Sequence, residues 1–484
     1  MLNTKGIRDG AILLSLGTGV SAMLKFISIP ILARVLTPEE FGIAGTALVL
    51  VGFATVLGAG NGLGTAIAYF KDNDESIDDT AFTISALVAV TLAVLFWSFS
   101  EPLSEFWGAS EAQGLIRIVS IFFPFSILAG IGNAILARDM NFRDITVVNI
   151  IATLLSTLTA IIMAYSGFGT ESLIAQYVVF NTCRCAGFFA FARYWPRLDF
   201  NGARWKTILP FAYNLTTSEV MMWASSELPF VLAARSLGIE AGGVYRLYQR
   251  FCALPREIIG ENLRRAAFIG MARKSPDIAR SGFLWGSKLL SYTLVAVFLW
   301  MAVVAEPLTH VVLGPNFASY WQLTAVLSLG LATQTAGSMV MPYLNSQGKT
   351  GRVLLASTMR TSLVLAGAVI GLMIDDRLIS MLVGSSCAMA LSSVLLLAYM
   401  IAFESITFSQ IRASILMPVA ISSVTATAAF FIGQLVQNTG PAPLSFLAII
   451  TLIGAAFYVT FLRIAVPTDF RILKEMLGAL KKRK

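Results

Sequence analysis

Long apolar segments alternate with short polar ones along the whole chain. Each apolar segment has about 20 to 25 residues, the length that a helix needs to cross about 30 Å of hydrocarbon. A transmembrane barrel would instead show segments of about ten residues in which apolar and polar positions alternate, and such segments are absent. The pattern predicts fourteen membrane-spanning helices, at about residues 10–34, 41–66, 80–100, 114–137, 145–166, 170–193, 206–234, 242–263, 281–305, 320–344, 352–374, 378–402, 412–436 and 443–462.

The composition agrees with this pattern. The chain of 484 residues is 56% hydrophobic and only 13% charged, whereas a soluble domain has about 25% charged residues. All connections between the apolar segments are short, so we expect an all-α polytopic membrane protein without an extramembrane domain. A single histidine, His310, argues against a multi-histidine metal site and against histidine-based catalysis. We therefore expect no metal ion and no cofactor, apart from a possible coupling ion.

The basic residues indicate the orientation of the chain. With a cytoplasmic N-terminus, 24 of the 35 Lys and Arg residues fall in segments on the cytoplasmic side, and only Arg34, Arg235 and Arg377 fall in outer loops. Because Lys and Arg are concentrated in cytoplasmic loops of membrane proteins, this asymmetry predicts that both termini are cytoplasmic. The net charge of +8 then belongs to a surface that lies against anionic lipid.

One turn occurs twice in the sequence. Residues 33–43 and 234–244 are separated by 201 positions, and five of the eleven pairs are identical. Both turns lie on the outer face of the predicted topology, and six spans separate them. Two halves in parallel orientation, related by an axis along the membrane normal, are expected from such a repeat, with a substrate cleft between them. The predicted organisation is a lobe at 1–200, a second lobe at 201–402, and two additional helices with a basic cytoplasmic tail at 403–484.

Eight basic residues fall inside predicted spans, and two of these, Arg117 and Lys288, are near span ends where they can reach the interface. A Lys or Arg at the centre of a membrane helix costs about 2.5 to 3.5 kcal/mol if it faces lipid. The six deeper residues must therefore face a wet cavity or charged partners. We predict that they form a cationic cavity for an anionic substrate; they are Lys25, Arg184, Arg246, Arg250, Arg256 and Arg360.

Acidic residues and prolines complete the candidate site. Glu219 and Glu227 share one face of the span at 206–234, where they either hold arginine side chains or bind a coupling H⁺ or Na⁺. An alternative interpretation is that all of these charges are structural ion pairs. Pro30 and Pro255 lie within about five residues of candidate cavity residues and are the predicted hinges. Arg34 and Arg235, in the repeated outer turn, are predicted structural or gate residues.

These features resemble the polysaccharide-transporter (oligosaccharide flippase) branch of the multidrug/oligosaccharidyl-lipid/polysaccharide exporter superfamily. The resemblance is carried by the fourteen short-looped spans, by the Gly-rich N-terminal part with Ala33-Arg34-x-Leu36-x-Pro38-x-x-Phe41-Gly42, and by Leu344-Asn345-Ser346-Gln347-Gly348. It implies two bundles of six helices around a central cavity, with two extra C-terminal helices. The related lipid II flippases use cationic residues in spans 1, 2 and 8. Here Lys25, Arg246, Arg250 and Arg256 lie in spans 1 and 8, and span 2 has no interior basic residue.

The resemblance also implies a function. The protein would flip polyprenyl-diphosphate-linked oligosaccharide across the bacterial inner membrane by alternating access, for exopolysaccharide, capsule or O-antigen synthesis. A polysaccharide polymerase and export machinery are possible partners, and nucleic acid is not. Two alternatives stay open: a cation-coupled multidrug exporter of the same superfamily, and a membrane-embedded polysaccharide polymerase or ligase. We do not expect an enzyme, because the longest predicted outer loop, at 306–319, has only about fourteen residues.

Overall fold

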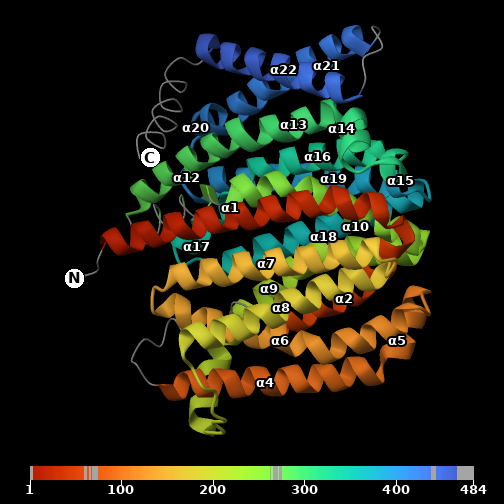
Figure 1. Ribbon diagram of the computed structural model, residues 1–484. Coiled ribbons are helices and arrows are strands. Elements are labelled where there is room, and N and C mark those ends of the chain that lie inside the picture. Colours follow the sequence, from red (N-terminus) through yellow and green to blue (C-terminus); the bar gives the residue numbers. More distant parts are fainter. Residues whose placement is uncertain are drawn as a thin grey trace. The chain divides into compact units, whose positions relative to one another are not determined.

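The computed structural model describes residues 4–58, 63–64, 67, 75–261, 263–264, 267, 271, 275–437 and 443–465. These residues form helices joined by short turns, and they include no strand (Figure 1). Within the described part of the chain, twelve helical segments are long and apolar enough to cross a membrane. The protein is therefore a multi-pass, all-α membrane protein, as the hydrophobic pattern predicts.

The twelve segments coincide with twelve of the fourteen predicted spans. The other two predicted spans are also helical, as α9 (Gly202–Leu237) and α10 (Ile239–Pro255), but they are not among the twelve apolar segments found in the described residues. These helices contain the charged residues of the candidate site, which lower their hydropathy. Charged membrane helices are stable where they face protein or water instead of lipid.

The chain divides by its internal contacts into two compact units. Unit 1 comprises Met1–Ile258 and Ser357–Met381, and unit 2 comprises Ile259–Ala356 and Leu382–Lys484. These units group residues by packing, whereas the lobes predicted at 1–200 and 201–402 were derived from a repeat in the sequence. The predicted lobes therefore stay a prediction.

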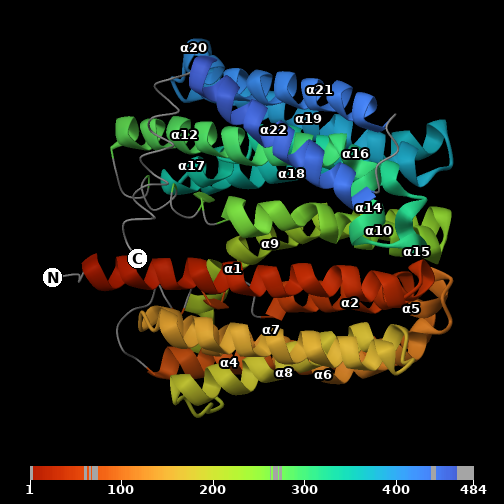
Figure 2. The same cartoon turned by 45° about the horizontal axis from the view of Figure 1, so that its top comes forward.

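Unit 1 contains nine helices of the described residues and most of a tenth. Here α1 packs on α7, α7 on α8, α8 on α6, and α6 on α4, while α2 packs on both α6 and α10 (Figure 2). Phe123, Phe188 and Phe230 are fully buried in this unit. Besides α9 and α10, its helices are α1 (Thr4–Val35), α2 (Pro38–Gly58), α4 (Glu75–Ser98), α5 (Ser100–Trp107), α6 (Ala112–Arg138), α7 (Phe142–Tyr165), α8 (Thr170–Ala192) and α18 (Thr350–Ile374), the last from Ser357 onward.

Unit 2 follows a π-helical turn, η1 (Arg256–Gly260), at the end of α10. In this unit α13 packs on α16 and α21, and α21 packs on α22. Phe298 and Phe317 are fully buried. Its described elements are α12 (Pro276–Leu290), η2 (Ser291–Val295), α13 (Ala296–Val303), α14 (Ala305–Val312), α15 (Pro315–Ala318), α16 (Trp321–Ala336), α17 (Val340–Ser346), α19 (Leu378–Phe403, from Leu382 onward), α20 (Phe408–Ile411), η3 (Arg412–Leu416), α21 (Met417–Gln437) and α22 (Pro443–Ala465).

Small polar side chains are buried in both units, while many large apolar ones are exposed. Thr46, Ser85 and Ser328 are completely buried, whereas Ile162 is 63% exposed and Leu452 is 72% exposed. This distribution is the one expected in lipid, because small residues let helices approach closely and their hydroxyls bond to backbone carbonyls. The exposed aliphatic side chains are the surface that contacts the bilayer.

Candidate functional site

A cluster of charged side chains lies between α1, α8 and α10 inside unit 1. On α1, the ammonium Nζ of Lys25 is 4.0 Å from the carboxylate Oε2 of Glu257, which lies in the π-helical turn after α10. The Lys25 side chain is 40% exposed and that of Glu257 is 42% exposed. The separation is at the upper limit for an ion pair, and both groups keep accessible surface. This pair can therefore exchange its contact for a contact with a ligand.

Two arginines surround this pair. Arg250 on α10 and Arg184 on α8 are both close enough to Lys25 to act on its charge through space. Arg250 is exposed. The guanidinium of Arg184 lies over the rings of Phe180 and Phe188, 5.2 Å and 5.3 Å from their centres, and its Nε donates no hydrogen bond to the described residues. Stacking on aromatic faces holds a cation without neutralising it.

Arg246, one turn before Arg250 on α10, has a different environment. Its guanidinium donates to the carboxylate of Glu227 on α9 and lies over the ring of Phe230, 5.1 Å from the ring centre. Each side chain of this ion pair is 19% exposed. Arg246 and Arg250 also repel each other electrostatically, so the pairing with Glu227 reduces the local excess of positive charge. Glu227 is thus placed to hold Arg246, and its assignment to charge balance or to coupling stays a prediction.

The net charge of the cluster is positive. Four cations and two carboxylates take part in the interactions described above: Lys25, Arg184, Arg246 and Arg250 with Glu227 and Glu257. Two positive charges are left over, in helices that cross or adjoin the membrane. An uncompensated charge of this size needs water or an anionic ligand.

The remaining predicted residues lie in the same unit at different places. Arg256 is exposed at the start of η1, Glu219 is half-buried on α9, and Arg360 is half-buried on α18. Pro30 lies inside the continuous helix α1, whereas Pro255 ends α10 directly before the π-helical turn. The helix therefore changes its hydrogen-bond pattern at Pro255, which lacks a backbone donor. The hinge roles of both prolines stay predictions.

Sequence reasoning missed the role of Glu257. Glu257 is not among the site residues that the sequence predicts. A signal was present, because Glu257 follows Arg250 by seven residues, and residues two helical turns apart share a face. The carboxylate that faces Lys25 thus comes from the helix that also carries Arg250.

The two copies of the repeated turn contact each other reciprocally. Helix α2 begins at Pro38 and α10 begins at Ile239, 201 positions later. A Cβ atom added at Gly42 would overlap the carbonyl oxygen of Ile239, and one added at Gly243 would overlap the carbonyl oxygen of Pro38. Since Gly42 and Gly243 are also 201 positions apart, the contact is symmetric. Only glycine lets the two helix starts approach this closely.

Arg34 and Arg235 lie in the last turns of α1 and α9, next to this contact, and both are exposed. The guanidinium of Arg235 lies 5.6 Å from the centre of the Phe106 ring on α5. Neither arginine belongs to the interactions of the Lys25 cluster described above. Their assignment as structural or gate residues of the outer turn stays a prediction.

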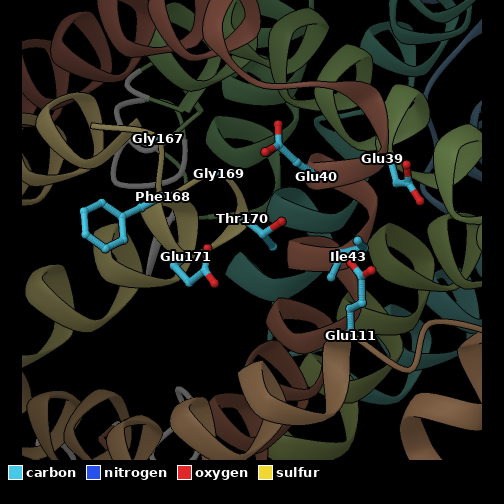
Figure 3. Close-up of a pocket in the computed structure, with 9 residues that line it drawn as sticks. All are labelled: Glu39, Glu40, Ile43, Glu111, Gly167, Phe168, Gly169, Thr170 and Glu171. Atoms are coloured by element: carbon cyan, nitrogen blue, oxygen red, sulfur yellow. The ribbon is translucent and has the colours of Figure 1, made fainter. Parts of the chain in front are cut away.

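A separate pocket of about 330 Å³ lies between the start of α2, the residue before α6 and the turn from α7 to α8, and it is acidic (Figure 3). Its four carboxylates are spread around the rim (Figure 3). Glu40 accepts hydrogen bonds from the backbone N and the Oγ1 of Thr37, at 2.7 Å and 3.1 Å, and so caps the start of α2. Within the described residues, no group of acids, histidines or cysteines is arranged to hold a metal ion. The pocket is lined by Glu39, Glu40, Ile43, Glu111, Gly167, Phe168, Gly169, Thr170 and Glu171.

Comparison with known proteins identifies the family. The family model described as "Polysaccharide biosynthesis protein" matches residues 31–322. The succinoglycan biosynthesis transport protein ExoT of Rhizobium meliloti (strain 1021) is 30% identical over 362 residues, which are 74% of this chain and 73% of ExoT. The chain belongs to the polysaccharide biosynthesis protein family. Another member with a similar sequence is the lipopolysaccharide biosynthesis protein WzxC of Escherichia coli (strain K12), 21% identical over 75% of this chain and 74% of WzxC.

Solved structures show which fold this member of the family has. The lipid II flippase MurJ in an inward closed conformation matches with a TM-score of 0.74 at 17% identity, over 96% of this chain and 99% of MurJ. An inward-facing multidrug transporter of the MATE family matches with a TM-score of 0.65 at 16% identity, over 82% of this chain and 98% of the transporter. The predicted all-α polytopic membrane fold is thereby confirmed.

Proposed function

We propose that this protein is a flippase for polyprenyl-diphosphate-linked oligosaccharide. It moves repeat units from the cytoplasmic to the outer leaflet of the bacterial inner membrane by alternating access, and supplies them to the synthesis of an exopolysaccharide, capsule or O-antigen. Membership of the polysaccharide biosynthesis family and the names of relatives such as ExoT support the substrate class. The excess positive charge around Lys25 is the single observation that carries the proposal.

The chemistry of the cluster fits a diphosphate. A diphosphate diester carries two negative charges at neutral pH, and the cluster has two positive charges in excess. Lys25 offers a compact ammonium, whereas Arg250 and Arg184 offer planar guanidinium groups that suit phosphate oxygens. A ligand that binds there replaces the contact between Lys25 and Glu257, which is 4.0 Å long and accessible. Glu257 is then the group that holds Lys25 when no substrate is bound.

We also propose an orientation of the chain in the membrane and candidate groups for coupling transport to an ion. Both termini lie in the cytoplasm, in accordance with the distribution of basic residues. No cofactor takes part, and Glu219 and Glu227 are the candidate groups for coupling to H⁺ or Na⁺. The protein forms and breaks no covalent bond. A polysaccharide polymerase or export complex receives the flipped product.

A flipping assay tests the proposal. Purified protein is reconstituted into liposomes that contain a polyprenyl-diphosphate-linked oligosaccharide, and the sugar that becomes accessible to an added glycosidase is measured. We expect Lys25→Gln and Arg250→Gln to abolish transport. Arg117→Gln is the matched control, because Arg117 also lies in a membrane helix but is held outside the cluster by Ser100, 3.0 Å from its Nε, and by the Trp97 ring.

Transport by both cluster variants at the rate of the unmodified protein would contradict the assignment of the site. Drug extrusion without sugar transport would favour the multidrug exporter, although the charge of the cluster is opposite to that expected for a cationic drug. Formation of new glycosidic bonds by the purified protein would show that it is an enzyme.

A further inference from the structure

The segment that connects α8 to α9 exposes large apolar side chains although it lies outside the membrane-spanning helices. Trp195 is 87% exposed, Leu198 is 65% exposed and Phe200 is 64% exposed. The apolar span before this segment ends at Ala192, and α9 begins at Gly202. Exposed apolar side chains that are grouped in this way mark a contact surface. We call residues 193–206 the α8–α9 segment.

Hydrogen bonds hold this segment against the start of α4 (Figure 1). The Tyr194 hydroxyl donates to Asp79 at 2.5 Å, and the backbone N of Arg197 donates to the same carboxylate at 3.2 Å. Further along, Asp199 accepts from the Thr80 hydroxyl at 2.5 Å, and its own backbone N donates to the Oγ1 of Thr83 at 2.8 Å. The backbone is therefore fixed at both ends of the exposed patch.

The same bonds determine which side chains are free. Tyr194 and Asp199, which bond to α4, are half-buried, whereas Trp195, Leu198 and Phe200 are exposed. The pattern is thus not a flexible loop that happens to contain apolar residues. The fold orders the loop and keeps its apolar side chains at the surface.

Basic residues alternate with these apolar side chains. Arg204 is neutralised by Asp199, with 2.8 Å between Nη1 and Oδ2. The side chains of Arg193, Arg197 and Lys206 are exposed, and none of them forms an ion pair with a carboxylate of the described residues. Within the described residues, these three positive charges around the apolar patch have no ion-pair partner. Aromatic residues and basic residues together are typical of surfaces that sit in the headgroup layer of a membrane.

We propose that the α8–α9 segment is a binding site for anionic phospholipid. Trp195, Leu198 and Phe200 enter the interfacial layer, and Arg193, Arg197 and Lys206 bind the phosphate groups of the lipids around them. With the cytoplasmic orientation proposed above, this lipid belongs to the inner leaflet, whose surface is negative. The site is distinct from the Lys25 cluster and does not depend on what that cluster transports.

Photo-crosslinking in lipid nanodiscs tests this site. The full chain carries p-benzoylphenylalanine in place of Trp195, and the nanodiscs contain equal amounts of phosphatidylglycerol and phosphatidylcholine. After irradiation, we expect adducts with the mass of a lipid, with phosphatidylglycerol in clear excess over phosphatidylcholine. The same probe in place of Asp277, whose side chain is 88% exposed at the start of α12, is the control for contact with water and should give few lipid adducts.

A variant without the three basic side chains separates the contact with lipid from the preference for an anionic headgroup. Combined Arg193→Gln, Arg197→Gln and Lys206→Gln should keep lipid adducts at position 195 but bring the ratio of the two lipids to about one, because the apolar contact does not discriminate between headgroups. Lipid adducts no more frequent at position 195 than at position 277 would contradict the proposal. So would an unchanged lipid ratio in the triple variant, or crosslinking in cells that yields a protein adduct at position 195 instead of a lipid adduct.

Discussion

Arg246 and Glu227 show how single charged residues are accommodated in this protein. Both side chains are 19% exposed, and their ion pair joins α9 to α10 beside the Phe230 ring. Lys25 and Glu257, in contrast, are 4.0 Å apart and about 40% exposed. The ion pair of Arg246 and Glu227 is largely shielded from water and joins two helices. The pair of Lys25 and Glu257 is accessible to water and to a ligand. The interpretation of the charges as structural ion pairs and the interpretation as a cationic cavity both stay predictions.

Substitution of Glu227 and Arg246 tests whether this ion pair stabilises the protein. In Glu227→Gln, Arg246 loses its carboxylate partner while it stays largely shielded from water. We expect the free energy of unfolding to fall by about 2 to 4 kcal/mol. This loss is smaller than for a fully buried pair, because both side chains are partly exposed. The measurement is unfolding in SDS after purification in detergent. The double variant Glu227→Gln/Arg246→Gln should lose less than either single variant. Equal, additive losses would show that the two groups do not interact.

Asp199 provides a second test at this scale, through its pKa. The hydrogen bond from Thr80 and the ion pair with Arg204 hold the pKa of this carboxyl below its ordinary value. A lowered pKa in the folded state means that the stabilisation is fully present above about pH 5 and is lost as the pH falls through the folded pKa. We expect hydrogen exchange of residues 193–201 to be slow at pH 7 and to accelerate only in strong acid, after correction for intrinsic rates. In Asp199→Asn, exchange should be faster at pH 7, and the difference from the unmodified protein should disappear in strong acid.

At the scale of secondary structure, the outer turn is the place where α2 and α10 begin and touch each other. Pro38 and Ile239 begin α2 and α10, and Gly42 and Gly243 permit the backbones to touch. Because each glycine contacts a carbonyl oxygen of the other helix, a methyl group at either position separates the helices. This end of unit 1 is closed by backbone contact instead of by side chains.

Substitution of the two glycines tests the closure. Gly42→Ala and Gly243→Ala should each destabilise the protein by about 1 to 3 kcal/mol, as overpacking does, measured as the free energy of unfolding in SDS after purification in detergent. Gly114→Ala on α6 is the matched control, since nothing lies within 4 Å of the added methyl group. That variant should be neutral or slightly more stable, because alanine favours a helix over glycine. Equal behaviour of all three variants would contradict the role of the contact.

At the scale of the whole molecule, the orientation of the chain in the membrane is still a prediction. A fluorescent protein fused after Lys484 should fold and fluoresce, and alkaline phosphatase at the same place should be inactive, because both termini are predicted to be cytoplasmic. Alkaline phosphatase inserted in the turn at Asp375–Arg377, between α18 and α19, should be active. The reverse result at either position would exclude the proposed orientation.

Most of the fold could be predicted from the sequence because the bilayer sets the length of each helix. The helix boundaries at the repeated turn, Val35 and Leu237, agree with the predicted ends within a few residues. The sequence also predicted that Lys25 and Arg250 line one cationic cavity, and this assignment stays a prediction. The bonds of Asp79 and Asp199 to the α8–α9 segment could not be predicted, because they join positions more than 110 residues apart and depend on how the helices pack. Local periodicity contains no information about such pairs.

The reciprocal contact of Gly42 and Gly243 has a consequence for the origin of the chain. A contact in which position i of one copy meets position j of the other, and j meets i, is the isologous interface of a two-fold symmetric dimer. Each copy of the turn contains everything that is needed to pair with another copy of itself. Fusion of two such subunits into one polypeptide would leave this interface in place and free the two copies to diverge. The acidic, basic and aromatic residues that now differ between α2 and α10 would then have diverged after the fusion, while the contact between the two glycines was kept.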